Sequence, residues 1–147
     1  MNEVVVHSGS IAQLIEFDLY VNDSFVYRQK ADGLIISSQT GSTAYSLSGG
    51  GPIVHPEANV FVLLPMLPQS LNTSPLLIQD ISSIKITLEN QKAIVSFDSH
   101  DNIKLSGNNE IVISKAGSSL ELIHPIEHDF FEACRNKLGW SSTISEP

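Results

Sequence analysis

Short strand-like segments recur along the chain at intervals of about ten residues, and this recurrence restricts its fold more than any other feature. Residues 14–21 alternate apolar and polar side chains, which is typical of a strand with one buried face. Turn-forming residues follow at 22–24 before β-type residues resume, so a hairpin is expected there. We expect further strands at residues 4–6, 33–37, 60–64, 84–88, 93–97, 110–114 and 120–123. The spacing predicts a mainly β, multi-stranded, sandwich-like domain over residues 1–147.

Two segments depart from the strand pattern and predict helices. Residues 42–48 follow a glycine and end before Gly49-Gly50-Gly51-Pro52, which predicts a short helix with a glycine stop. Near the C-terminus, apolar side chains at positions 130, 131, 134 and 138 form the stripe of an amphipathic helix over residues 127–138. Pro125 and Gly139 are expected to mark its two ends.

Charge and cysteine content exclude several classes of function. The chain carries 8 Lys and Arg against 16 Asp and Glu, a formal net charge of −8, and has no basic run. Binding to a nucleic-acid backbone needs clustered Lys and Arg, so we expect no nucleic-acid partner. The apolar stretches fall far short of the roughly 20 residues that span a bilayer, so we expect no membrane partner. Cys134 is the single cysteine, and a cytoplasmic location therefore fits best.

The strongest local signal is the segment from Asp32 to Tyr45. A strand runs into a small-residue loop and then a helix start, so backbone N–H groups and the hydroxyls of Thr40, Ser42 and Thr43 are expected to face one opening. Such an opening suits phosphates, a ribose or a base edge. The alternative is that Ser42 or Thr43 merely caps the helix. The segment matches neither a Walker A loop nor Gly-x-Gly-x-x-Gly.

Two further polar groups each have two interpretations. Asn2 and Glu3 place an amide and a carboxylate at the mouth of the first strand, where they could clamp vicinal hydroxyls or form a solvated strand end. Asp98, His100 and Asp101 could converge on a metal or an acid–base site. The same residues are also ordinary for a turn between two strands.

Metal and nucleophile chemistry find little support in the sequence. His124 and His128 have the i, i+4 spacing of a zinc pair, but Pro125 is expected to place His124 outside the helix, and no third ligand is evident. We therefore expect no metal site. No Gly-x-Ser-x-Gly segment exists, which argues against a serine hydrolase. Cys134 lies on the apolar stripe, where a core role is expected.

Taken together, these motifs resemble the bacterial NAD kinases. The matching stretches are, in chain order, Asn2-Glu3-Val4-Val5, Asp32-Gly33-Leu34-Ile35-Ile36-Ser37, Thr40-Gly41-Ser42-Thr43-Ala44-Tyr45-Ser46-Leu47-Ser48, Gly50-Gly51-Pro52-Ile53, His55-Pro56, Ser74-Pro75-Leu76, Asp98-Ser99 and Lys137-Leu138-Gly139-Trp140. The Thr-Gly-Ser-Thr-Ala-Tyr run with its preceding Asp-Gly is highly specific to that family.

The resemblance implies a phosphotransferase. In the family, ATP or polyphosphate, with Mg²⁺ or another divalent metal, phosphorylates the 2′-hydroxyl of the adenosine ribose of NAD and gives NADP. An N-terminal α/β domain carries a Gly-Gly-Asp-Gly loop whose aspartate is regarded as the general base. This sequence contains no such loop, so the resemblance implies the C-terminal NAD-binding domain, inactive alone and without a catalytic residue of its own. Family members assemble as dimers or tetramers, so a homo-oligomer is implied.

The resemblance also assigns roles by position. Asn2 and Glu3 are implied to hold the adenosine ribose and the adenine edge. The residues implied to line or flank the adenine and nicotinamide-ribose pockets are Thr40, Thr43, Ala44, Tyr45 and Ser48.

Three further positions carry implied roles away from the adenine. Asp32, with Lys30 beside it, is implied to reach a dinucleotide held mainly by a neighbouring subunit, and Asp98 to approach the nicotinamide end. The sequence departs from the family where Ser38-Gln39 replaces the usual Thr-Pro, which could loosen the loop. It departs again at Ser99-His100, because some relatives place His directly after the aspartate, and a phosphate contact by His100 is therefore not expected.

Two alternatives remain open. The chain could be a non-catalytic nucleotide-binding or regulatory β-domain, which an in-frame upstream Gly-Gly-Asp-Gly segment would argue against. A lipid-kinase relative is the weaker alternative, because such proteins lack the Thr-Gly-Ser-Thr-Ala-Tyr motif.

Overall fold

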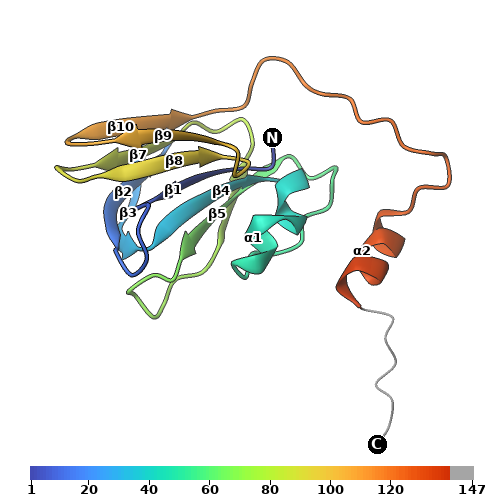
Figure 1. Cartoon of the computed structure of the whole chain (residues 1–147). Coiled ribbons are helices and arrows are strands. Elements are labelled where there is room, and N and C mark those ends of the chain that lie inside the picture. The colour runs from blue at the N-terminus through green and yellow to red at the C-terminus, as the bar shows by residue number, and fades with distance from the viewer. Residues whose placement is uncertain (140–147) are drawn as a thin grey trace, which may run out of the picture. The chain divides into compact units, whose positions relative to one another are not determined.

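The computed structural model describes residues 1–139, which fall into two compact units, Met1–Lys115 and the part of Ala116–Pro147 that is described (Figure 1). Trp140, the last residue of the family-like stretch, lies outside the described residues. The strands, all in the first unit, are β1 (Glu3–His7), β2 (Ile15–Val21), β3 (Ser24–Ala31), β4 (Gly33–Ser38), β5 (Val60–Met66), β6 (Leu76–Gln79), β7 (Ile84–Leu88), β8 (Ala93–Phe97), β9 (Asp101–Leu105) and β10 (Asn109–Ile113).

These strands form two antiparallel sheets, which confirms the expected β-sandwich. One sheet has six strands in the order β6-β5-β4-β1-β8-β9, and the other has four in the order β10-β7-β2-β3. β1 lies inside the larger sheet, where Glu3 pairs with Ser37 of β4 and Val4 pairs with Phe97 of β8. The first residues of the chain are therefore held between two strands that are distant in sequence.

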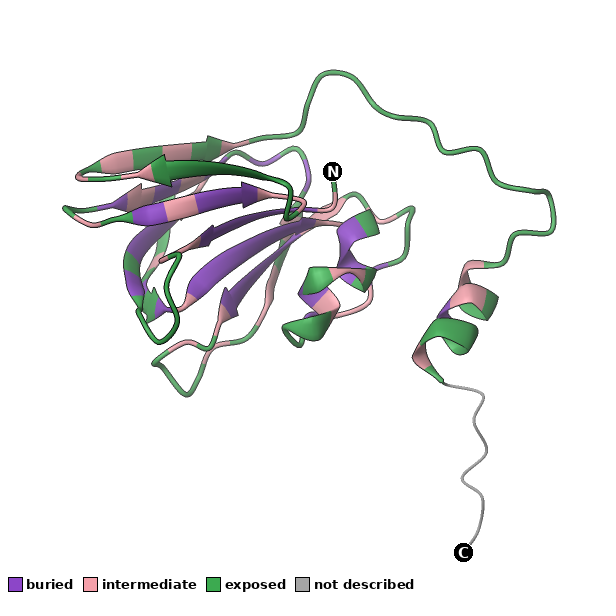
Figure 2. Cartoon of the chain, viewed as in Figure 1, coloured by how far each residue is buried: buried purple, intermediate pink, exposed green. Residues whose placement is uncertain are grey.

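The main core lies between the two sheets and follows the period-two pattern (Figure 2). In β1, Val4 and Val6 join this core, whereas Val5 belongs to a second cluster. From the smaller sheet, Phe17 and Leu19 are at most 1% exposed. Burying one such side chain stabilises the fold by about 1.5–3 kcal/mol, so alternating apolar residues fix which face of each strand turns inward.

The second cluster lies on the outer face of the larger sheet, where Val5, Ile35 and Leu64 are each at most 5% exposed. Next to it the chain forms a 3₁₀ turn, η1 (Thr40–Thr43), and a one-turn helix, α1 (Tyr45–Ser48). The helix expected at residues 42–48 is thus two short elements. A Cβ atom at Gly49 would lie 2.9 Å from Cδ2 of Leu64, so glycine allows this segment to lie close to the sheet.

Three expectations about the chain's elements are corrected by the structure. Residues 120–123 form no strand, and Leu120 and Ile123 are 83% and 96% exposed. The C-terminal helix α2 (Phe130–Leu138) begins after Asp129, whose carboxylate accepts the N–H of Phe131 at 2.8 Å, and not near Pro125. Strands β6 and β9 were not expected. The stop at Gly139 is confirmed, with φ of 68°.

Among the described residues, no helix is both long and apolar enough to cross a membrane.

Candidate functional site

The Asn2-Glu3 pair is held in place by the turn between β8 and β9. One carboxylate oxygen of Asp98 accepts the backbone N–H of Asn2 at 2.7 Å and that of Glu3 at 3.0 Å. In return, the backbone N–H of Asp98 donates to the carbonyl of Glu3 at 3.2 Å. Asp98 and Ser99 adopt left-handed conformations, with φ of 46° and 60°, to make this turn. The Asp98 carboxylate is therefore engaged with the backbone of the Asn-Glu pair.

The small-residue loop contacts the same pair from the other side. The backbone N–H of Ser38 donates to the carbonyl of Asn2 at 2.9 Å. A Cβ atom at Gly41 would lie 2.1 Å from that carbonyl oxygen, so only glycine permits this approach. The structure therefore brings Asn2, Glu3, Asp98 and the start of the Thr-Gly-Ser-Thr-Ala-Tyr run together, although they span nearly the whole first unit.

The Glu3 carboxylate is the most unusual group at this site. The residue is 6% exposed, and Oε2 is buried without a hydrogen-bond partner in the described part of the chain. Burial raises the pKa of Glu3, the negative charge of Asp98 raises it further, and the N-terminal ammonium partly opposes both. A buried acceptor without a donor costs free energy in the free protein. It is therefore suited to a ligand that brings a hydroxyl or N–H donor.

The hydroxyls of the loop do not all face one opening, contrary to expectation. Ser42 is fully buried, and its hydroxyl donates to the carbonyl of Gln39 at 2.7 Å and accepts the N–H of Val54 at 3.0 Å. Neither η1 nor α1 has a side-chain cap, so helix capping does not explain these residues either. Thr40 and Thr43 are exposed, and the Thr43 hydroxyl donates to the carbonyl of Thr40 at 3.4 Å. Through its hydrogen bonds to Gln39 and Val54, Ser42 connects the loop to the segment after α1.

The rest of the run presents its side chains to solvent. Tyr45 is 41% exposed, Ser48 is exposed and Ala44 is half-buried. Tyr45 and Asp32 line a single cavity of about 340 Å³ within one chain. Sequence reasoning missed several polar residues that line the same cavity, among them His7, Ser96 and Asn102. These three come from β1, β8 and β9, and only the strand register reveals that they are neighbours.

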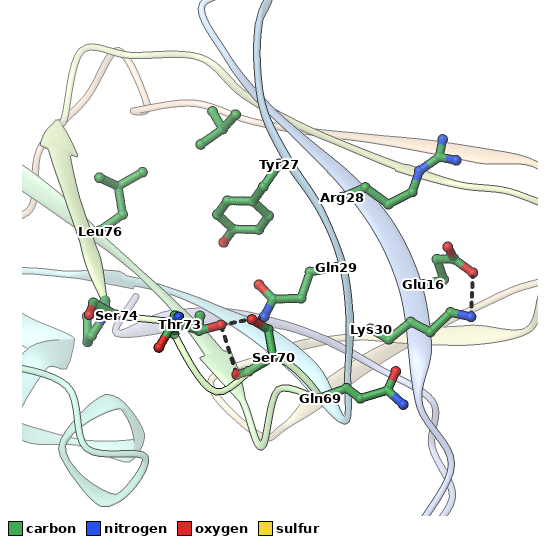
Figure 3. A pocket seen from close by; sticks show the side chains of 13 residues that line it. Glu16, Tyr27, Arg28, Gln29, Lys30, Gln69, Ser70, Thr73, Ser74 and Leu76 are labelled. Atoms are coloured by element: carbon green, nitrogen blue, oxygen red, sulfur yellow. Dashed lines mark hydrogen bonds and ion pairs between the residues drawn. The ribbon is translucent and has the colours of Figure 1, made fainter.

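Lys30 lies apart from that cavity, although Asp32 is only two residues away. The chain crosses from the four-stranded sheet to the six-stranded sheet at Asp32, between β3 and β4. The Lys30 ammonium pairs with Glu16 at 3.3 Å and lines a second cavity of about 730 Å³ (Figure 3). The structure therefore does not bring Lys30 and Asp32 into one site of a single chain.

The second cavity lies between β3 and the segment that leads into β6. Figure 3 shows Gln29, Thr73 and Ser70 joined by hydrogen bonds on one side, with Gln29 donating to Thr73 at 2.7 Å. The hydroxyl of Tyr27 is buried without a partner among the described residues, and burial raises the pKa of Tyr27 to about 12. Ser74, within the family-like Ser-Pro-Leu stretch, also lines this cavity.

The C-terminal unit contains the histidine pair. The rings of His124 and His128 stack with centroids 4.1 Å apart. Within residues 1–139, no three His, Cys, Asp or Glu side chains gather in a way that could hold a metal ion.

The first unit is thus a two-sheet β-sandwich with a buried polar site where the first strand meets a small-residue loop. Residues 1–125 match the family model for the ATP-NAD kinase C-terminal domain, and the chain belongs to this family.

Whole proteins related to the chain are about twice its length. An NAD kinase of Saccharophagus degradans is 46% identical over 97% of this chain and 49% of its own length. One of Alcanivorax borkumensis is 48% identical over 97% of this chain and 48% of its own length. The chain thus spans about half the length of the curated relatives it matches.

Solved structures agree with this assignment. The match to the crystal structure of yeast NADH kinase complexed with NADH covers 100% of this chain and 46% of the yeast chain. Its TM-score is 0.89, and the sequence identity is 27%. The match to the structure of an NAD kinase from Archaeoglobus fulgidus in complex with ATP covers 79% of this chain and 45% of the archaeal chain. Its TM-score is 0.73, and the sequence identity is 34%.

Proposed function

We propose that this chain supplies the dinucleotide site of an NAD kinase, which transfers a phosphoryl group from ATP or polyphosphate to the 2′-hydroxyl of the adenosine ribose of NAD and so forms NADP. Family membership supports the reaction class. The observation that supports the site is the buried, unpartnered Oε2 of Glu3, which lies where Asn2, Asp98 and the loop meet.

The proposed roles follow from what each group can donate or accept. The carboxylate of Glu3 accepts hydrogen bonds from ribose hydroxyls, and the Asn2 amide both donates and accepts. The exposed hydroxyls of Thr40 and Thr43 and the ring of Tyr45 line the adenine and nicotinamide-ribose pockets. Ala44 and Ser48 flank these pockets. Asp98 positions the Asn2-Glu3 pair, because its Oδ1 accepts the backbone N–H groups of both residues.

The metal ion of the proposed reaction is not assigned to residues 1–139. A divalent metal such as Mg²⁺ is proposed to accompany ATP, but the described residues include no group of three possible ligands to hold it. We therefore assign no step of this chain to a metal.

The proposal includes a homo-oligomer and a cytoplasmic location. Phe25 and Val26 are 58% and 36% exposed on β3, an edge strand, and exposed apolar side chains on such an edge favour association. In an oligomer, Lys30 and Asp32 could reach a dinucleotide that a neighbouring subunit holds. The single cysteine, Cys134, supports the cytoplasmic location.

Titration with NAD, followed by the backbone amide signals in nuclear magnetic resonance spectra, tests the proposed site. We expect the largest shifts at Glu3, Thr43 and Tyr45, because their environment changes when a ribose and a base are bound. The amide of Glu110, on the edge strand β10, serves as the internal control. Shifts concentrated instead at Thr73, in the second cavity, or no shifts at millimolar NAD, would contradict the proposal.

The 147-residue chain is expected to form no NADP when it is incubated with NAD, ATP and magnesium. The reason is that the aspartate regarded as the general base belongs to a Gly-Gly-Asp-Gly loop, which this sequence does not contain. An enzymatic assay for NADP measures this directly. Turnover above the background without protein would show that the base lies in the present chain.

A further inference from the structure

The second cavity, beside β3, is closed by the segment that joins β5 to β6. β3 and β6 are edge strands of different sheets. Residues 67–75 run past β3, and two hydrogen bonds fasten them to it. The backbone N–H of Gln69 donates to the carbonyl of Lys30 at 2.9 Å, and the side chain of Gln29 donates to Thr73 at 2.7 Å. The enclosed space of about 730 Å³ is large enough for a small molecule.

Tyr27 brings a hydroxyl donor to this cavity. Its ring packs edge-on against Phe17 in the core, with centroids 6.2 Å apart, which fixes the side chain. The hydroxyl is buried and has no partner among the described residues. Burial raises the pKa of Tyr27 to about 12, so the hydroxyl keeps its proton at neutral pH. The free protein therefore carries a buried donor that a ligand in the cavity can satisfy.

Gln29 supplies an acceptor whose direction is determined by its neighbours. The residue is 8% exposed, and its side chain leaves β3 on the same face as that of Tyr27, two positions away. The Thr73 hydroxyl donates to the carbonyl of Ser70 at 3.3 Å, so it accepts from the NH₂ group of Gln29. Oε1 of Gln29 is thus turned away from Thr73, and no described residue donates to it. Figure 3 shows the side chains of Tyr27 and Gln29 extending from β3 toward the segment that carries Thr73.

The charges around the cavity are already paired. Among the described residues, the charged side chains that line it are those of Glu16, Arg28 and Lys30. Lys30 pairs with Glu16 at 3.3 Å, and Arg28 donates two hydrogen bonds to Asp18, at 2.6 and 2.7 Å. The remaining polar side chains are neutral amides and hydroxyls, from Tyr27, Gln29, Gln69, Ser70, Asn72, Thr73 and Ser74. A neutral polar ligand therefore fits this cavity better than an ion does.

A compound with hydroxyl groups on adjacent carbons matches these groups, because one hydroxyl accepts from Tyr27 while the next donates to Gln29. Its C–H groups suit the apolar wall that Pro75 and Leu76 provide. We propose that this cavity binds a small neutral polyhydroxyl compound, a monosaccharide or a polyol. Tyr27 and Gln29 contact the ligand, and Thr73 is a positioning residue that acts through Gln29. The inference goes beyond the proposed function, because a dinucleotide carries phosphate charges that this cavity does not neutralise.

Three probes test the proposal through the backbone amide signals of the 147-residue chain: D-glucose, its open-chain polyol sorbitol, and glucose 6-phosphate. We expect glucose or sorbitol at millimolar concentration to shift the amides of Gln29 and Thr73 and to leave those of Glu3 and Tyr45 unchanged. The tighter of the two identifies the ligand as a sugar ring or an open-chain polyol. Glucose 6-phosphate is expected to bind about tenfold more weakly, because its phosphate meets no unpaired cation.

Two results of these titrations would overturn the inference. Unchanged signals of Gln29 and Thr73 with both neutral probes, even at high millimolar concentration, would show that the cavity holds solvent only. Equal or tighter binding of glucose 6-phosphate would show that the cavity is not selective for neutral ligands.

Tyr27→Phe removes the donor and keeps the ring. We expect this variant to weaken binding of the tighter neutral probe about tenfold. Since the hydroxyl has no partner among the described residues, its loss is also expected to raise the midpoint of thermal unfolding by about 2–4 °C. Tyr20→Phe is the matched control, because the ring of Tyr20 contacts Phe25 and the Lys85 ammonium instead. Unchanged binding in Tyr27→Phe, or a lower unfolding midpoint, would overturn the role of Tyr27.

Two substitutions at Thr73 test its role as a positioning residue. Valine keeps the shape of threonine and removes the acceptor that holds the Gln29 amide, whereas serine keeps that acceptor. We expect Thr73→Val to weaken binding of the tighter neutral probe about fivefold and Thr73→Ser to restore most of it. The side-chain NH₂ signals of Gln29 are expected to move in Thr73→Val and to stay near their original positions in Thr73→Ser. Unchanged binding in Thr73→Val, or no recovery in Thr73→Ser, would overturn the role of Thr73.

Discussion

Gly41→Ala is expected to weaken NAD binding strongly and to destabilise the first unit. The new Cβ atom would lie 2.1 Å from the carbonyl oxygen and 2.6 Å from the carbonyl carbon of Asn2. These are backbone atoms of the Asn2-Glu3 pair, so no side-chain rotation can relieve the contact. The loop and the start of β1 must therefore move apart.

The cost of that movement has two parts. Overpacking of this kind costs about 3 kcal/mol in the free energy of unfolding, which chemical denaturation measures. Displacing Asn2 and Glu3 from the loop by about an ångström is expected to weaken NAD binding on the order of 100-fold in calorimetry.

A second glycine provides the control for this substitution. Gly117 has open space around its Cβ position and no positive φ, so Gly117→Ala is expected to change stability by less than about 0.5 kcal/mol. If Gly41→Ala unfolded at the same denaturant concentration as the wild type and bound NAD as tightly, the close approach of loop and strand would not exist in solution.

The sequence predicts the sandwich well because burial and alternation coincide in most of its strands. In β1, β4 and β7, alternate apolar residues fill the core between the sheets, so the pattern and the structure agree. The exceptions have physical reasons. β9 is an edge strand with exposed polar residues, so it lacks an apolar pattern. Residues 120–123 have the apolar pattern but pair with no described strand.

The candidate site is only partly predictable for a related reason. The Asn2-Glu3 pair and the glycine-containing loop are short local motifs, and the structure brings them together as their resemblance to a family suggested. The contacts of Ser96 with His7 and Asn102 depend on the register of three strands. Ser42 is buried because the carbonyl of Gln39 and the N–H of Val54 offer it hydrogen-bond partners. No local pattern contains that information.

Glu3→Gln is expected to stabilise the free chain at neutral pH while it weakens NAD binding. The raised pKa of Glu3 means that the ionised carboxylate is less favourable in the folded chain than in the unfolded chain. Glutamine has nearly the same shape and no charge to bury. The same substitution removes a charged acceptor for ribose hydroxyls, which is expected to cost about 1–3 kcal/mol of binding free energy.

The pH dependence gives the sign of the stability effect. Below the ordinary glutamate pKa of 4.5, the carboxyl group is protonated in both states, and the two proteins should be similar in stability. As the pH rises from there through the raised pKa of the folded state, the wild type loses the stability that protonated Glu3 contributed, and Glu3→Gln does not. The excess stability of Glu3→Gln should therefore grow with pH and become constant above the folded-state pKa.

Thermal unfolding of both proteins between pH 4 and pH 8, together with calorimetric titration of NAD at pH 7, measures the two effects. Glu110→Gln is the matched control, because Glu110 is exposed on the edge strand β10 and should change neither quantity. An excess stability that is the same at pH 4 and pH 8 would show that ionisation of Glu3 is not its cause. A ribose hydroxyl that donates to the Glu3 carboxylate loses its charged acceptor in Glu3→Gln. Unchanged NAD affinity in this variant would therefore show that the buried oxygen of Glu3 does not contact the ligand.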